Sequence, residues 1–215
     1  MKYEAVIFDL DGTLIDSLGV WEKIDAEFLG KRGLKPTKEY AEAIKAMSFF
    51  DTAKYTIKEF NLEETVEELI NEWHEMALNE YSNNIKLKPF AKEYIETLKE
   101  KGIRIVLATS CSEYLFEQVL KNNGIYKYFD LMCTTEEVAT GKETPDLFLH
   151  VAEQIGVLPE NCLVFEDILV AIKSAKMAGM DAYGIYDQFS DLQWEEIKAV
   201  ADGVIYDFAD APMMI

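Results

Sequence analysis

The sequence is poor in cysteine, which argues against a disulfide-stabilised protein and against a cysteine-based zinc protein. It has three cysteines in 215 residues, namely Cys111, Cys133 and Cys162, and no two of them form a C-x-x-C pair. An odd count without that spacing predicts neither a disulfide framework nor a zinc site. The pattern is typical of buried, reduced thiols.

Basic residues are also scarce. The chain has 21 Lys and Arg against 40 Asp and Glu, which gives a formal net charge of −19 at pH 7. Proteins that bind nucleic acid or anionic membrane surfaces use Lys and Arg to neutralise phosphates. We therefore expect no nucleic-acid partner and no membrane partner. The charge does not indicate disorder, because 49% hydrophobic and 12% aromatic residues are enough to build a core.

Long hydrophobic runs are missing as well. No apolar run approaches the roughly 18 residues that a membrane helix needs. The first segment, MKYEAVIFDLDG, contains Glu4 and Asp9 and so lacks the uninterrupted apolar stretch of a signal peptide. We expect a folded cytoplasmic protein. The sequence leaves its oligomeric state open, and a monomer is compatible with it.

Short apolar runs bounded by turn residues predict strands. They cover residues 3–8, 103–108, 129–133, 162–166 and 181–186, with a weaker sixth run at 203–208. The stretches between most of them repeat apolar residues every three or four positions, which predicts helices with one buried face. The alternation predicts an α/β fold with a Rossmann-like, doubly wound parallel sheet and right-handed crossovers.

One interval departs from the alternation. Residues 16–83 hold several helical patterns in succession and no convincing strand, and the longest apolar stripe runs from Val66 to Met76. We therefore expect an all-helical cap at 16–83, inserted into a catalytic core made of 1–15 and 84–215.

Charged and hydroxyl side chains follow four of the predicted strands. In open parallel sheets, ligands bind at the carboxyl ends of the strands, so these side chains are expected at one edge. They are Asp9 and Asp11 after the first strand, Thr109 and Ser110 after the second, Lys142 beyond the third, and Glu166 and Asp167 after the fourth.

This set of side chains indicates phosphoryl transfer. One carboxylate can attack a phosphoryl group when a hard divalent cation and fixed donors balance the negative charge, and a second acid can protonate the leaving oxygen. Oxygen ligands without a nearby histidine favour Mg2+ over zinc or copper. The expected partner is a small-molecule phosphate ester, and the expected cofactor is Mg2+.

The same residues carry a resemblance to a known family. The run FDLDGTLIDS at 8–17, Thr109 in VLATS, Lys142 in GKETPDLF, and Glu166 with Asp167 in VFED resemble the four motifs of the haloacid dehalogenase superfamily of phosphotransferases. The motifs stand in the expected order. The helical insertion lies where the beta-phosphoglucomutase-like and sugar-phosphatase branch has its cap.

The resemblance implies a role for each residue. Asp9 would be the nucleophile that becomes phosphorylated, and Asp11 the general acid and base. Thr109, Ser110 and Lys142 would hold the phosphoryl group, with Lys142 linking it to Asp9. The metal ligands would be Asp9, Asp11 through its backbone carbonyl, Asp167, and Glu166 either directly or through water.

The resemblance leaves more than one activity open. Hydrolysis of a sugar or polyol phosphate is favoured, and the alternative is a sugar phosphomutase of the beta-phosphoglucomutase type. Such mutases usually carry a histidine where this chain has Trp21, and a cap arginine for a second phosphate. A signalling receiver domain is disfavoured because its acceptor Asp follows a later strand. A non-catalytic binding protein is disfavoured by the complete set of charged residues.

Overall fold

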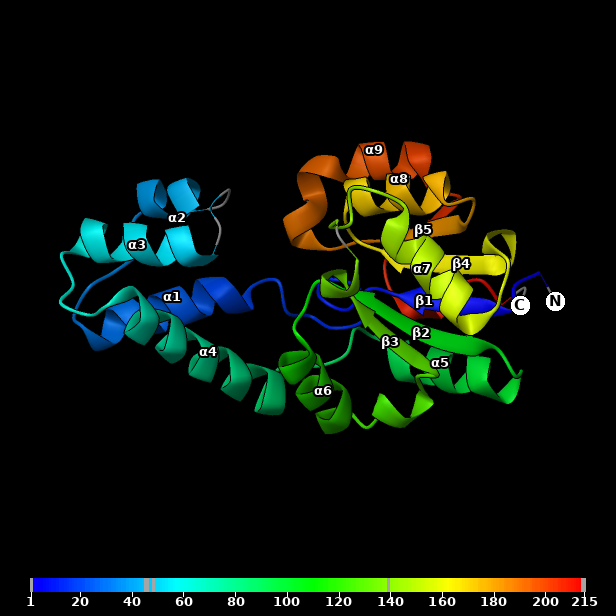
Figure 1. Cartoon of the computed structure of the whole chain (residues 1–215), viewed down its shortest axis with the longest axis horizontal. Helices are drawn as coiled ribbons and strands as arrows, with labels where there is room; N and C mark the ends of the chain where they lie inside the picture. Colours follow the sequence, from blue (N-terminus) through cyan, green and yellow to red (C-terminus); the bar gives the residue numbers. More distant parts are fainter. Residues whose placement is uncertain (1, 45–46, 48, 139, 214–215) are drawn as a thin grey trace. The chain divides into compact units, whose positions relative to one another are not determined.

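The computed structural model describes residues 2–44, 47, 49–138 and 140–213. The chain divides into two compact units, which we call the core unit, Met1–Leu18 with Ile85–Ile215, and the helical unit, Gly19–Asn84. Figure 1 shows the elements of both.

The helical unit contains α1 (Val20–Lys31), α2 (Lys38–Ile44), α3 (Phe49–Phe60) and α4 (Val66–Asn83). The core unit contains β1 (Ala5–Phe8), α5 (Ala91–Glu100), β2 (Arg104–Thr109), α6 (Glu113–Asn122), β3 (Leu131–Thr134), α7 (Asp146–Ile155), β4 (Cys162–Glu166), α8 (Leu169–Met177), β5 (Asp181–Ile185), α9 (Trp194–Val200) and β6 (Gly203–Ile205), with short 3-10 turns between them.

The core unit is built on a parallel sheet, which confirms the predicted fold class. Its six strands are ordered β3-β2-β1-β4-β5-β6, and every pair is parallel. The chain therefore leaves β1 in one direction through β2 and β3, and then returns to the other side of β1 to add β4, β5 and β6. This reversal between β1 and β4 is the switch point at which sheets of this kind bind ligands.

Both faces of the sheet are covered, which explains why its strands are nearly continuous apolar runs. One face carries an aromatic cluster in which the rings of Phe8 and Phe165 stack with centroids 5.4 Å apart, and Tyr94 from α5 and Phe208 pack against them. The opposite face packs small and aliphatic side chains against α7, α8 and α9. Figure 1 shows helices on the two sides of the sheet.

The sixth strand is shorter than the sequence predicts. The apolar run at 203–208 forms a strand only over Gly203–Ile205, and Phe208 begins a separate 3-10 turn. Phe208 is 3% exposed because it leaves the sheet direction to join the aromatic cluster. Strand β6 therefore ends early because the Phe208 ring packs into the aromatic cluster.

None of the helices in the described part of the chain has both the length and the apolar composition needed to cross a membrane.

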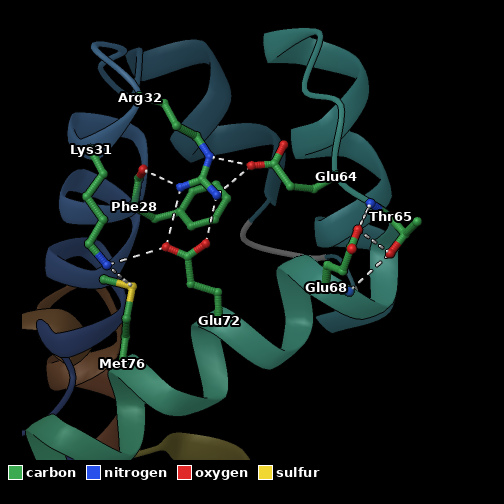
Figure 2. A network of polar contacts seen from close by, with 8 residues as sticks. All are labelled: Phe28, Lys31, Arg32, Glu64, Thr65, Glu68, Glu72 and Met76. Carbon is green, nitrogen blue, oxygen red and sulfur yellow. Dashed lines mark hydrogen bonds and ion pairs between the residues drawn. The ribbon is translucent and has the colours of Figure 1, made fainter.

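In the helical unit, Arg32 holds α1 and α4 together (Figure 2). Its Nε donates to Glu64 Oε1 at 2.8 Å, and one terminal nitrogen donates to Glu72 Oε2 at 2.7 Å. The other terminal nitrogen donates to the carbonyl of Phe28, whose ring centroid lies 3.8 Å from the guanidinium carbon. The planar guanidinium thus meets two carboxylates, one carbonyl and one ring.

The start of α4 lies beside this network. The hydroxyl of Thr65 accepts from the backbone N–H of Glu68 at 3.2 Å, and Glu68 Oε2 accepts from the N–H of Thr65 at 2.8 Å. These reciprocal bonds satisfy two donors that a helix start otherwise leaves free. The capped start fixes the turn from which Glu64 reaches Arg32.

We expect Arg32→Ala to lower the free energy of unfolding of the protein by about 1–2 kcal/mol, because it removes two half-buried ion pairs and the stacking on Phe28. Urea unfolding measures this. Lys31→Ala is the matched control, since Lys31 is 56% exposed and its Nζ lies 3.4 Å from Glu72; its effect should stay near zero. Equal effects for the two variants would contradict the assignment.

Candidate active site

The switch point brings Asp9 and Glu166 next to each other. In the register of β1 with β4, Phe8 pairs with Phe165, and the N–H of Asp9 donates to the carbonyl of Phe165 at 3.0 Å. Asp9 is the first residue beyond β1, and Glu166 is the last residue of β4. Two acidic side chains far apart in sequence are therefore neighbours at the carboxyl edge of the sheet.

A lysine lies between these carboxylates. Carboxylate oxygens of Asp9, Glu166 and Asp167 all lie within 4.8 Å of one another. Lys142 donates to both Asp9 and Glu166. The four side chains are between 1% and 6% exposed, so water screens them little. This buried group, which we call the carboxylate–lysine cluster, combines three acids with one base.

The cluster holds three acids against one lysine, so one lysine does not balance its charge. Burial raises the pKa of Glu166 to about 7, with Lys142 opposing the shift and Asp9 adding to it. Burial, followed by the charges of Glu166 and Asp9, raises the pKa of Asp167 well above its usual range. Burial lowers the pKa of Lys142, but Asp9 and Glu166 outweigh it and keep the ammonium charged. A further cation would relieve the excess negative charge.

Asp167 is oriented by hydroxyl groups from two loops. Thr13 Oγ1 donates to one carboxylate oxygen at 3.3 Å, and Ser190 Oγ donates to the other at 3.2 Å. Gly12 lies against the same carboxylate: it has φ +81°, and a Cβ there would come within 2.5 Å of Asp167 Oδ2. Both the backbone angle and the close approach require glycine.

Ser190 was not among the residues predicted from the sequence. It lies in the 3-10 turn Gln188–Gln193 after β5. Asp187 anchors the turn: its carboxylate accepts from Lys88 Nζ at 2.6 Å and from the N–H of Phe189 at 2.9 Å. Its position after the fifth strand end is the only sequence signal that could have identified it, because a serine in a loop is otherwise unremarkable.

Asp11 is half-buried and lies two residues beyond Asp9. Ser17 Oγ donates to its Oδ1 at 2.6 Å. Its carboxylate is not one of the three in the carboxylate–lysine cluster. The turn that carries both acids is closed by the N–H of Gly12 donating to the carbonyl of Ile15 at 3.0 Å. The two acids thus have different surroundings, one facing Lys142 and the other a serine hydroxyl.

Thr109 and Ser110 follow β2, the strand beside β1. Thr109 is 1% exposed, and its Oγ1 accepts from the N–H of Cys111 at 3.0 Å. Its Oγ1 is the acceptor in this bond, so the bond does not use the hydroxyl proton, which can be donated to an anion. The side chain of Ser110 is exposed.

The loop that carries Lys142 is anchored at the start of α7. Thr140 Oγ1 and Thr144 Oγ1 donate to Asp146 Oδ2 at 2.9 and 2.7 Å. These bonds lower the pKa of Asp146 and keep its carboxylate charged at the positive end of α7. Both sides of Lys142 are thereby fixed to the same helix.

The helical unit has a cavity of its own, of about 700 Å³. The rings of Trp21, Tyr40 and Trp73 line it, together with the acids Glu22 and Asp25. Burial raises the pKa of Asp25 to about 6, with a hydrogen bond from Tyr40 opposing the shift. The cavity therefore offers aromatic surface beside a carboxyl group.

The geometry of the core unit agrees with the comparisons to known proteins. The model of the haloacid dehalogenase-like hydrolase family matches residues 6–185, so the chain belongs to this family of enzymes. The phosphorylated carbohydrates phosphatase of Thermotoga maritima is 29% identical over 189 residues, covering 87% of this chain and 88% of the relative. The fructose-1-phosphate phosphatase of Escherichia coli is 28% identical, covering 86% of this chain and 97% of the relative.

The similarity extends to solved structures. A Thermotoga maritima protein, named provisionally as a beta-phosphoglucomutase, superposes with a TM-score of 0.82 at 28% identity and covers 94% of each chain. The predicted resemblance is thus confirmed at the level of the family.

Proposed function

We propose that the protein is a Mg2+-dependent phosphatase that hydrolyses a small phosphorylated sugar or polyol through an aspartyl-phosphate on Asp9. The observation that carries the proposal is the buried carboxylate–lysine cluster, in which Asp9 contacts Lys142 and lies within 4.8 Å of two further carboxylates. The names of the relatives support the substrate class, because one acts on phosphorylated carbohydrates and another on fructose 1-phosphate.

Two carboxyl groups have separate roles, Asp9 as the nucleophile and Asp11 as the general acid and base. A carboxylate oxygen of Asp9 attacks phosphorus, the ester P–O bond breaks, and the leaving oxygen takes a proton from Asp11. Asp11, now a carboxylate, then removes a proton from water, whose oxygen attacks phosphorus. The bond between phosphorus and the Asp9 oxygen breaks, which releases inorganic phosphate and restores the Asp9 carboxylate. The different surroundings of the two acids, Lys142 for Asp9 and Ser17 for Asp11, suit these different roles.

Three groups would hold the transferred phosphoryl group. Lys142 offers an ammonium that contacts the nucleophile, and Thr109 offers a hydroxyl proton. Ser110 is proposed to contribute its backbone N–H, because its side chain is exposed. Donors fixed in advance cost no rearrangement when negative charge moves in the transition state.

The carboxylate–lysine cluster suits a hard divalent cation, since its donors are all oxygen and its acids outnumber its base. Asp9, Asp167 and the backbone carbonyl of Asp11 would hold Mg2+, with Glu166 as a direct or water-mediated ligand. When bound, the cation would offset the charges of nucleophile and phosphate. Thr13 and Ser190 keep the Asp167 carboxylate in one orientation for this purpose.

We further propose that the helical unit acts as a cap that selects the organic part of the substrate. Its cavity of about 700 Å³ has the size of a small-molecule site. Its aromatic rings can pack on a sugar or polyol carbon chain, and its acids can accept from hydroxyl groups. The proposed boundaries are residues 16–83 for the cap and 1–15 with 84–215 for the catalytic core.

Hydrolysis is favoured over the mutase reaction by the state of Arg32. Mutases of this type use a cap arginine to hold a second phosphate, and Arg32 is the single arginine of the helical unit. Its guanidinium is bound to Glu64 and Glu72 and to the carbonyl of Phe28. An arginine neutralised by two carboxylates is not available as a phosphate clamp.

We expect purified protein to release inorganic phosphate from members of a sugar- and polyol-phosphate panel when Mg2+ is present, and to lose this activity in excess EDTA. Addition of Mg2+ should restore it. A requirement for a sugar bisphosphate, with accumulation of an isomeric monophosphate, would establish the mutase instead. Turnover that persists in EDTA would contradict the proposed metal dependence.

A further inference from the structure

A second group of potential metal ligands lies outside the carboxylate–lysine cluster. Cys133, Glu137 and His150 offer a sulfur, a carboxylate oxygen and an imidazole nitrogen that lie within 4.8 Å of one another. They come from β3, from the 3-10 turn Thr135–Glu137 that follows it, and from α7. Three different donor types from three elements thus converge on one point.

Glu137 is held so that it faces the other two residues. Its Oε1 accepts from the N–H of Thr134 at 2.7 Å, which closes a capping box at the end of β3. Its Oε2 lies 3.9 Å from His150 Nε2, a distance that is long for a hydrogen bond. The sulfur of Cys133 lies within 4.8 Å of a carboxylate oxygen of the same side chain. One carboxylate oxygen is therefore fixed by the backbone while the acid faces both remaining ligands.

We propose that Cys133, Glu137 and His150 form a binding site for a Zn2+-like divalent cation. The cation would replace the thiol proton of Cys133, which passes to solvent, and would bind the thiolate, the carboxylate and the neutral imidazole. A thiolate and an imidazole select Zn2+ over Mg2+, whereas the three carboxylates of the other cluster favour Mg2+. Three protein ligands leave a fourth position for water.

The exposure of the ligands suits a site that a cation can reach from solvent. Cys133 is fully buried, while the side chains of Glu137 and His150 are 46% and 28% exposed. The cation would approach from the Glu137 and His150 side and meet the thiol at the inner end. The sequence did not predict this site, because its ligands have no C-x-x-C or histidine-pair spacing.

Bound metal would also affect the loop that carries Lys142. Cys133 and His150 lie on either side of that loop in sequence, and Thr134, next to Cys133, pairs with Thr109 across β2 and β3. A cation that joins β3 to α7 would restrain the chain between them. An effect of this restraint on turnover rests on the proposed phosphatase function, whereas binding of the cation does not.

Titration with Co2+ in the presence of excess Mg2+ tests the site by absorption spectroscopy. We expect one equivalent of Co2+ to produce a thiolate-to-cobalt charge-transfer band, and Zn2+ to displace it. Co2+ that enters the carboxylate–lysine cluster gives no such band, because that cluster has no sulfur. The band therefore reports on this site even if the protein has no phosphatase activity.

The ligands are tested by substitution. Cys133→Ser should abolish the band, and His150→Ala should raise the apparent Kd for Co2+ by at least about ten-fold. His150 is partly exposed, so its variant keeps the test valid if Cys133→Ser does not fold. The matched controls are Cys162→Ser, at another buried thiol, and His74→Ala, at the only other histidine. Absence of the band in the parent, or parent-like binding by His150→Ala, would overturn the proposal.

Discussion

Asp9→Asn is expected to reduce kcat for phosphate release by at least about 10⁴-fold, a loss in the range found when a covalent nucleophile is removed. An amide oxygen is a poor nucleophile and cannot form the acyl phosphate. The Asn side chain has nearly the same shape as Asp, so the loss reports on chemistry. Phosphate release with Mg2+ and the best ester from the panel measures it, and acid quenching during turnover should trap phosphate on the parent protein alone.

The control for this variant must separate chemistry from folding. Asp9 is one of three buried carboxylates beside one lysine, so neutralising it relieves repulsion with the other two while it weakens one ion pair. We therefore expect Asp9→Asn to unfold at a urea concentration close to that of the parent. Asp210→Asn, at an exposed position in the last 3-10 turn, should keep parent turnover. Parent-like turnover by Asp9→Asn would exclude the aspartyl-phosphate.

Lys142→Met should lower the free energy of unfolding by about 3–5 kcal/mol in EDTA, because it leaves buried carboxylates without their counter-charge. Methionine keeps the apolar length of the lysine stem and removes only the ammonium. Urea unfolding in EDTA and in Mg2+ measures the effect. The cation should restore part of the lost stability, since it neutralises the same carboxylates. A second substitution, Glu166→Gln, should also restore part of it.

Lys88→Met provides the matched comparison. Lys88 and Asp187 form another shielded pair, with side chains 10% and 4% exposed and their charged atoms 2.6 Å apart. Loss of this lysine should destabilise the protein in EDTA, but Mg2+ should not rescue it, because Asp187 is not part of the carboxylate–lysine cluster. An unchanged urea midpoint for Lys142→Met, or equal rescue of both lysine variants, would contradict the charge argument.

Much of the fold could be predicted from local sequence pattern. The apolar run at 162–166 coincides with β4, and the run at 103–108 differs from β2 by one residue at each end. Such runs identify parallel strands because both faces of the sheet are covered. The prediction was less accurate for β6, because Phe208 turns out of the strand to reach an aromatic cluster whose other members lie far away in sequence.

The candidate site was only partly accessible from the sequence. Asp9, Glu166 and Asp167 could be placed at one edge because parallel strands end together. That Lys142 donates to both Asp9 and Glu166 could not be derived in this way, since its loop ends are fixed by Thr140 and Thr144 at α7. Ser190 was missed for the same reason: a turn anchored by another pair carries it to Asp167.

The sequence by itself determined the alternation of strands and helices, the acidic balance and the order of the motifs, because these depend on residue type and short-range periodicity. Only the tertiary structure decided which charges meet. Lys142 is separated from Asp9 by 133 residues and from Glu166 by 24. The tertiary structure likewise brings Cys133, Glu137 and His150 together. Contacts between side chains that are distant in sequence depend on strand order and loop anchoring, which no local pattern encodes. These contacts determine where a buried negative charge needs a cation.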